Sequence, residues 1–457
     1  MLTNFLEHTR CPEGIVSPLV ERLPAVSKAK SGELESPSNG SAQVGIRSVF
    51  NPVELLKALE HSVSGGHQTI KGLSEFDDAI RVLRLEQYVD SSHSSINPGG
   101  LKSLVRQCYY WLRPLFPVSF RKYLQRIALR NWDSIPFPKW PVDFTTEKIM
   151  DAVWQQLLTL QDGEELPFIW FWPEGQSSCC IMTHDVETAV GRDFCKTMME
   201  MEKRHGITSA FEVVPEERYA VPEEYLQEIR DGGSEVCLHG LNHDGHLFSS
   251  EAIFQERAPK INAYAKSWGA VGFRSPVMYR NLEWIHAFQF SYDMSVPNVA
   301  HLDPQRGGCC TVMPYFIGDI VELPLTTTQD YSLFHILQQR SLDLWKKQIA
   351  MIQERYGLIS FIIHPDYVNE KWSSNLYDAL LGYLAELRAK HGIWMTLPRE
   401  VDSWWRARRE MRLIQENGTW RISGTQADRA RVAYASLKDG RVVYRVDTAK
   451  GVASVVQ

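Results

Sequence analysis

Residues 179–187 read Cys-Cys-Ile-Met-Thr-His-Asp-Val-Glu, a short apolar run that ends abruptly in a histidine and two carboxylates. Such a run, bounded by charge, predicts a buried parallel strand that presents polar side chains at its carboxyl end. In α/β folds that end is where catalytic groups usually lie. Asp185 and Glu187 can therefore divide the chemistry, one holding a metal ion and the other accepting a proton. On its own, the stretch is equally compatible with an acidic turn that caps the following helix.

The chain around this stretch alternates between strand and helix patterns. Apolar runs typical of strands occur near 179–184, 209–214, 235–238, 270–273, 320–323, 358–363 and 393–397. Helical periodicity occurs near 189–205, 222–231, 249–267, 341–356 and 374–391. The alternation predicts an α/β fold with a parallel sheet, most simply closed into a barrel. A nucleotide-binding Rossmann fold is disfavoured because the chain has no Gly-x-Gly-x-x-Gly or phosphate-cradling loop.

Composition shifts divide the chain into four predicted segments. They are a weakly structured or helical N-terminal region (1–100), a basic helical arm (101–164), the barrel (165–409) and a small antiparallel β appendage (410–457). The appendage is indicated by two hairpin-turn dipeptides, Asn417-Gly418 and Asp439-Gly440, which are flanked by β-prone runs. No catalytic pattern occurs in the first segment.

The first 30 residues of the basic arm carry positive charges and no negative ones. Residues 101–130 contain seven Lys and Arg side chains interleaved with apolar ones, and the first acidic residue is Asp133. Such an amphipathic segment can lie on an anionic membrane surface. The alternative is a helical arm that packs on the next domain and leaves its charges in solvent.

Bulk properties exclude several classes of protein. The net charge of −6 over 457 residues disfavours a general nucleic-acid binder. The eight cysteines form no Cys-x-x-Cys pair, which favours a reducing environment over a disulfide framework or zinc ribbon. With no signal-like N-terminus and no run of 18 apolar residues, we expect a cytoplasmic protein that contacts membranes only peripherally, through 101–130. No pattern indicates an oligomeric state.

A pair of histidines follows another predicted strand. His239-Gly-Leu-Asn-His243 comes directly after an apolar run. On a helical turn, positions i and i+4 share a face, so both imidazoles could reach one ion. Two imidazoles and one carboxylate, with positions open for water and substrate, are typical of a catalytic zinc site. The nearby His246 could be a further ligand, but a loop-surface role is expected for it.

Three more polar residues end predicted strands or follow them. Arg274, in Gly-Phe-Arg-Ser-Pro, can keep a neighbouring carboxylate ionised, or form a plain structural salt bridge. Asp293 can orient a neighbouring group or cap a turn. His364, at the end of an apolar run, can serve as a general acid at the same rim, or be a hydrogen-bonded core residue.

Together these residues resemble the polysaccharide deacetylase family (carbohydrate esterase family four), and most closely its bacterial exopolysaccharide-associated members. The motifs that carry the resemblance, over about residues 165–400, are Thr183-His-Asp185-Val-Glu187, His239-x3-His243, Arg274-x-Pro276, Asp293 and His364. The resemblance implies a distorted (β/α)7 barrel. It also implies removal of acetyl groups from N-acetylated sugars with a divalent metal, most commonly zinc.

The resemblance also implies a role for each residue. The metal ligands would be Glu187, His239 and His243; the catalytic residues would be Asp185 as base, Arg274 as its partner, His364 as acid and Asp293 as a supporting group. Two departures put this in question. Val186 stands where the family has a second adjacent aspartate, so the roles of the two carboxylates could be exchanged. Gly240 stands where the family has Ser or Thr, which would loosen the loop that holds the ligands.

The sequence therefore predicts a metal-dependent hydrolase acting on an N-acetylated sugar, glycan or lipid-linked glycan precursor. One alternative keeps the fold but changes the substrate to a non-sugar amide. Another is a catalytically silent glycan-binding or assembly protein, in which Val186 and Gly240 mark decay of the site. Aromatic side chains such as Trp172 or Tyr367 are expected to stack on sugar faces.

Overall fold

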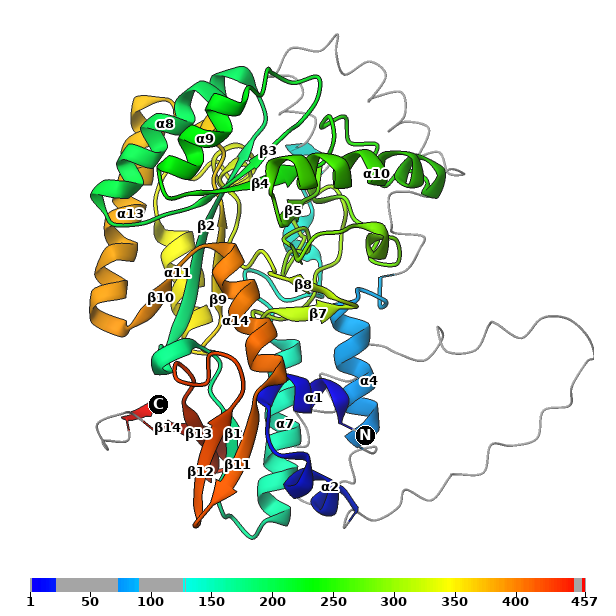
Figure 1. Ribbon diagram of the computed structural model, residues 1–457, viewed down its shortest axis with the longest axis vertical. Helices are drawn as coiled ribbons and strands as arrows, with labels where there is room; N and C mark the ends of the chain where they lie inside the picture. The colour runs from blue at the N-terminus through cyan, green and yellow to red at the C-terminus, as the bar shows by residue number, and fades with distance from the viewer. Residues whose placement is uncertain (1, 22–72, 90–125, 128, 448–453, 457) are drawn as a thin grey trace, which may run out of the picture.

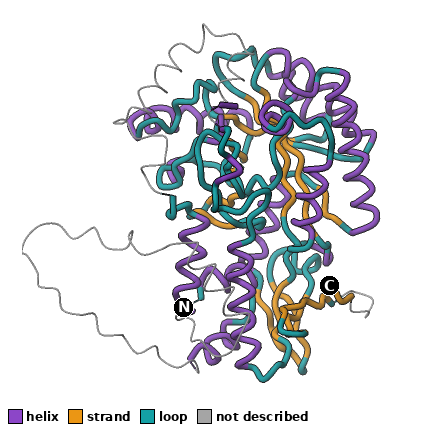
Figure 2. The backbone as a smooth tube through the Cα atoms, turned by 180° about the vertical axis from the view of Figure 1, so that it is seen from behind, coloured by secondary structure: helices purple, strands orange, loops and turns teal. Residues whose placement is uncertain are grey.

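The computed structural model describes residues 2–21, 73–89, 126–127, 129–447 and 454–456 (Figure 1). They form a larger α/β part, with a curled sheet inside and helices around it, and a smaller part built from an antiparallel sheet and helices. Figure 2 shows the same two parts from behind, with helices at the periphery of the larger part.

The central strand of the larger part is β2 (Ser178–Val186), all of whose residues are buried or nearly so. It pairs with β9 (Leu358–Ile362) along 179–183. It also pairs with β10 (Ile393–Met395) along 178–180 and with β3 (Ala210–Val213) along 183–186. A strand has two edges, so β9 occupies one of them while β10 and β3 share the other.

From β3 the parallel sheet continues strand by strand. The order is β4 (Glu235–His239), β5 (Gly272–Arg274), β6 (Tyr292–Asp293) and β8 (Ile320–Glu322), with β7 (Tyr315–Ile317) antiparallel at the edge. Beyond β8, the hydroxyls of Thr326 and Thr327 donate to the carbonyls of Leu358 and Ser360 in β9, each at 2.7 Å. These bonds bring the two ends of the sheet together, so it curls into a partly closed barrel.

The predicted α/β barrel architecture is thus confirmed, with one difference in its strands. All seven predicted apolar runs contain a strand of this sheet. However, β10 pairs only beside the amino end of β2, and the two-residue β6 takes a place between β5 and β8 that was not predicted. Two residues are too few to show a strand periodicity.

Helices cover the outside of the curled sheet (Figure 1). They are α8 (Ala189–Arg204), α9 (Glu223–Asp231), α10 (Glu251–Trp268), α11 (Asp343–Gln353), α12 (Pro365–Val368) and α13 (Lys371–His391). A further helix, α14 (Pro398–Glu410), runs from the sheet to the smaller part. Two begin at N-cap hydroxyls, since Thr188 accepts from the backbone N–H of Gly191 and Ser250 from that of Ile253. None of the described helices is both long and apolar enough to cross a membrane.

The smaller part joins segments from both ends of the chain. β1 (Leu166–Ile169) pairs with β13 (Val432–Lys438), which continues into β14 (Arg441–Val446) and β15 (Ser454–Val456). β11 (Arg412–Glu416) and β12 (Thr419–Ser423) form a separate hairpin. At both predicted hairpin turns the central residues have positive φ, 51° and 77° at Asn417-Gly418 and 52° and 74° at Asp439-Gly440.

The described N-terminal residues pack in the same smaller part (Figure 1). Their helices are α1 (Thr3–Thr9), α2 (Glu13–Glu21) and α4 (Leu73–Arg84), and they pack with α7 (Thr145–Leu160), which belongs to the predicted 101–164 arm. Phe5 of α1 meets Trp154 of α7 edge to face, with ring centroids 4.8 Å apart, inside a shared apolar cluster. Nearly all of the basic stretch at 101–130 lies outside the described residues, and the four segment boundaries stay predictions.

Candidate active site

The polar residues at the carboxyl end of β2 lie on both faces of the strand. Side chains alternate along a strand, so Thr183 and Asp185 point into the barrel while His184 points outward. The ring of His184 lies 2.6 Å from Glu202 Oε1 of α8 and 2.9 Å from the carbonyl of Ile363. His184 is therefore a hydrogen-bonded core residue.

Asp185 faces a fully buried arginine. Nη1 of Arg274 donates at 2.8 Å to Asp185 Oδ1 and at 2.8 Å to the hydroxyl of Thr183, and lies 3.3 Å from Glu212 Oε2. Burial opposes ionisation of Asp185, but the charges of His239, Arg274 and His364 hold its pKa below the usual value. Burial, together with the nearby charge of Asp185, raises the pKa of Glu212 well above its usual value, although Arg274 opposes this.

Glu187, His239 and His243 form a second group at the same rim. One ligand atom from each lies within 4.8 Å of the other two. Nε2 of His243 is 2.8 Å from Glu187 Oε1, and the two imidazole centroids are 5.0 Å apart. The predicted helical turn is absent, since His239 ends β4 and His243 sits in a bend with φ of 56°. Burial opposes ionisation of Glu187, but the charge and hydrogen bond of His243 lower its pKa.

The donors of this group fit a divalent cation. Nδ1 of His239 is 3.2 Å from the carbonyl of Arg274, so it carries the proton in the neutral ring and leaves a lone pair on Nε2. That Nε2 atom is buried and has no hydrogen-bond partner among the described residues. Burial lowers the pKa of His239 to about 4, which favours the neutral form that binds metals. The group whose ligand atoms all lie within 4.8 Å of one another contains Glu187 and the two histidines, while Asp185 Oδ2 lies 3.6 Å from Nε2 of His239.

His364 reaches the site from β9 and is held by a residue that the sequence interpretation missed. Its Nε2 lies 3.9 Å from Asp185 Oδ2 and 3.6 Å from Glu187 Oε1. Asp330 binds its other ring nitrogen. Burial works against the charged ring, but Asp330 first, and then Glu187 and Asp185, raise the pKa of His364 to about 10. The only signal for Asp330 in the sequence was an acidic residue a few positions beyond an apolar run.

Asp293 has its hydrogen-bond partner outside this group. Its Oδ1 accepts from the hydroxyl of Ser295 at 2.6 Å, and it is the register partner of Glu322 on β8. Burial raises the pKa of both carboxyls. Within the described residues, Asp293 makes no hydrogen bond or ion pair with Asp185, His239 or His364.

The turn after β2 is fixed from the β9 side by Asp366. Its carboxylate accepts from the backbone N–H of Glu187 at 3.2 Å and from the hydroxyl of Thr188. A Cβ at Gly191 would come within 2.4 Å of this carboxylate, so the glycine makes room for it. Asp366 thereby links the backbone of Glu187 to the segment that carries His364, which lies two positions before Asp366 in the sequence.

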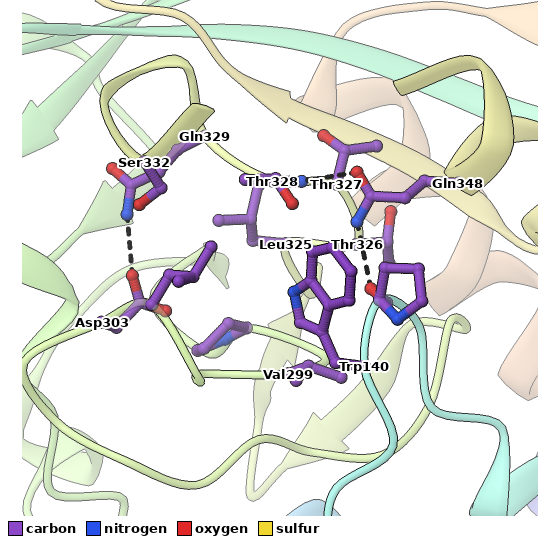
Figure 3. Close-up of a pocket in the computed structure, with 13 residues that line it drawn as sticks. Trp140, Val299, Asp303, Leu325, Thr326, Thr327, Thr328, Gln329, Ser332 and Gln348 are labelled. Carbon is purple, nitrogen blue, oxygen red and sulfur yellow. Dashed lines mark hydrogen bonds between the residues drawn. The ribbon is translucent and has the colours of Figure 1, made fainter. Parts of the chain in front are cut away.

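The segment that carries Asp330 is also fixed from outside the barrel. Gln329 and Ser332 line a small cavity, and Nε2 of Gln329 donates at 2.8 Å to Asp303 Oδ1 across it (Figure 3). Trp140 forms another wall of this cavity, so the chain before α7 reaches the surroundings of the site.

The expected aromatic platform is only partly present. Trp172 is fully buried and donates its indole N–H to the carbonyl of Tyr356 at 2.5 Å, so its predicted contact with sugar is wrong. Tyr367 is only partly buried, and its ring centroid lies 4.9 Å from that of His364.

Comparison with known proteins adds a structural likeness. No family model and no curated protein matches the sequence. Polysaccharide deacetylases of carbohydrate esterase family four are among its structural neighbours. With identities below 20% and TM-scores below 0.5, these similarities do not establish an activity for this chain.

Three solved structures illustrate the likeness. A proposed polysaccharide deacetylase from Mycobacterium smegmatis has 17% identity and a TM-score of 0.42, over 55% of this chain and 97% of that chain. The PuuE allantoinase has 12% identity and a TM-score of 0.40, over 52% and 92%. The family 4 carbohydrate esterase from Streptomyces lividans has 12% identity and a TM-score of 0.32, over 48% and 92%.

Proposed function

We propose that this protein is a metal-dependent hydrolase that removes an N-acetyl group from an N-acetylated sugar, glycan or lipid-linked glycan precursor. The observation that carries the proposal is the meeting of two groups at one barrel rim. Asp185 and His364 face each other 3.9 Å apart, directly beside the Glu187, His239 and His243 cluster. A base, an acid and a metal-ligand set are what amide hydrolysis needs.

Glu187, His239 and His243 would hold the cation, with zinc as the expected metal because two imidazoles and one carboxylate suit it. A divalent cation there supplies a Lewis acid that polarises the amide carbonyl and makes a water molecule more acidic. Three protein ligands leave room for both water and substrate.

Asp185 takes the proton of the attacking water in this proposal. Its lowered pKa keeps the carboxylate available as a base, and the bond from Arg274 fixes the other oxygen. Because Arg274 is also held by Thr183, the carboxylate cannot rotate freely.

His364 gives a proton to the departing amine. Its raised pKa keeps the ring charged at neutral pH, and Asp330 directs Nε2 toward the reacting atoms. An amine leaves poorly without such a proton. Asp293 supports the rim indirectly, since it pairs in register with Phe273, the residue before Arg274.

The proposed substrate and location rest on the sequence and on its resemblance to the deacetylase family. An N-acetylated carbohydrate is the expected substrate, with no nucleic-acid partner. A cytoplasmic location, peripheral membrane contact through 101–130 and a role in exopolysaccharide synthesis stay predictions.

Metal analysis of the purified protein tests the proposal. We expect about one zinc ion per wild-type chain and none in a Glu187→Ala, His243→Ala double variant. His246→Ala, which changes a loop histidine outside the ligand group, is the matched control and should keep the metal. No metal in the wild type, even after reconstitution with zinc, would contradict the proposal. Acetate release from N-acetylglucosamine oligomers, compared with opening of cyclic amides, then distinguishes a sugar deacetylase from a hydrolase of non-sugar amides.

A further inference from the structure

The loop that carries His243 cannot use the anchor expected from the resemblance. Gly240 has φ of 67°, and a Cβ built there would lie 2.5 Å from Cγ of Pro276. A serine or threonine therefore does not fit at this position. The loop needs another anchor because His243 itself adopts the left-handed region, which non-glycine residues disfavour.

An arginine of α10 provides such an anchor, in addition to the contacts of Leu241 and Asn242 with Glu216 and Glu217. Nη1 and Nη2 of Arg257 donate to Oδ1 and Oδ2 of Asp244 at 2.8 and 2.7 Å, a two-point ion pair. Nη1 also reaches Oδ1 of Asn242 at 3.4 Å. Arg257 thus contacts the residue before His243 and the residue after it.

Both ends of this contact are well supported. Asp244 Oδ1 also accepts from the backbone N–H of His246 at 2.8 Å, which closes the turn. On the helix side, Phe254 and Ala258 flank Arg257 and are buried in the apolar cluster beneath α10. The side chains of Arg257 and Asp244 are only 18% and 29% exposed, so solvent screens the pair less than a surface ion pair.

From this geometry we infer that Arg257 is a positioning residue for the metal site. By holding Asn242 and Asp244, it fixes the backbone of His243 so that the imidazole meets Glu187 and His239. The inference rests on the proposed function, because it assigns Arg257 to the same ligand set. In this inference the contacts of Arg257 compensate for the loosening that glycine at 240 is expected to cause.

Arg257→Met tests the inference, because it removes the guanidinium and keeps an apolar stem. The matched control is Lys260→Met on the same helix. The Lys260 side chain is 55% exposed, and its Nζ lies 3.5 Å from Glu256 Oε1. Zinc affinity is measured by competition with a chelator, and hydrogen–deuterium exchange is measured on the metal-free proteins.

We expect Arg257→Met to weaken zinc binding about 10–100-fold, the usual cost of losing a group that orients a metal ligand. In the metal-free protein, exchange should rise at 242–246 and stay unchanged in the barrel strands. Arg257→Lys, which cannot make the two-point contact, should recover part of the affinity. Lys260→Met should match the wild type in both measurements.

Zinc affinity within about twofold of wild type in Arg257→Met would overturn the inference, as would faster exchange spread evenly over the barrel. If Arg257→Met does not fold, Asp244→Asn keeps a neutral acceptor and carries the same expectations. A wild type without zinc affinity would overturn the proposed function. The exchange at 242–246 would then decide by itself whether Arg257 orders the loop.

Discussion

Asp330 binds His364 through both of its carboxylate oxygens. Oδ1 lies 2.6 Å from the ring Nδ1, and Oδ2 accepts from the backbone N–H of the same residue at 2.8 Å. The two bonds fix the direction of the ring as well as its charge, so Nε2 can only face Asp185 and Glu187. The acid of the proposed reaction is thus set by a residue 34 positions away in the sequence.

Asp330→Asn should lower activity and shift its pH dependence. Without the carboxylate charge, the pKa of His364 falls from about 10 toward neutrality, so the protonated acid is lost at lower pH. We expect kcat/KM at pH 8 to drop about 10–100-fold, with the alkaline limb of the profile moved to lower pH. A pH–rate profile that has the wild-type shape in the variant would contradict this role.

Asp185→Asn should abolish turnover and leave metal binding intact. The amide keeps the shape of the side chain but cannot accept a proton, so we expect a loss of at least about 10²-fold in kcat. Zinc content, measured on the same preparation, should stay near wild type, whereas Glu187→Gln should lose the metal. If Asp185→Asn loses zinc and Glu187→Gln keeps it, the two carboxylates have exchanged roles.

Arg274→Met should strongly destabilise the fold. The substitution leaves Asp185 and Glu212 buried without their common partner, which typically costs about 3–5 kcal/mol in the free energy of unfolding. Adding Glu212→Gln removes one of the two carboxyls and should recover part of the loss. Urea unfolding of the wild type, both single variants and the double variant measures this coupling. Strictly additive effects would show that Glu212 does not depend on Arg274.

The stability of the Glu322→Gln variant, compared with that of the wild type, should improve as the pH rises. Burial raises the folded-state pKa of Glu322, with Asp293 beside it adding to the shift. A raised carboxyl pKa gives a stabilising contribution that is complete below the unfolded value of about 4 and is lost as pH rises toward the folded value. Denaturation at pH 5 and pH 8 should therefore show a larger gain, or a smaller loss, for the variant at pH 8. An equal effect at both pH values would contradict a protonated Glu322.

Local sequence patterns predicted the strands of the barrel, but they did not predict most of the side-chain contacts inside it. Long apolar runs such as 179–184 and 358–363 showed the strands, and their polar ends showed Asp185 and His364. The residues that hold the site carry no comparable signal: Asp330 binds His364, Glu212 faces Arg274 and Arg257 binds Asp244, and each pair meets only through folding. The alternation of strand side chains could have separated His184 from Asp185, since neighbouring residues point to opposite faces.

The pairing of β1 with β13 constrains the order in which the protein can fold, because β1 has no partner until β13 has been synthesised. Residues 166–169 leave the ribosome well before their partners at 432–435, yet they are fully buried in the finished fold. During synthesis, this apolar strand stays unpaired while about 260 further residues are added. Exposed strand edges of this kind promote aggregation. A chain ending at residue 409 would stay permanently in that state. The C-terminal sheet therefore covers β1 only when synthesis is almost complete, and a chain that stops before β13 keeps this apolar edge exposed.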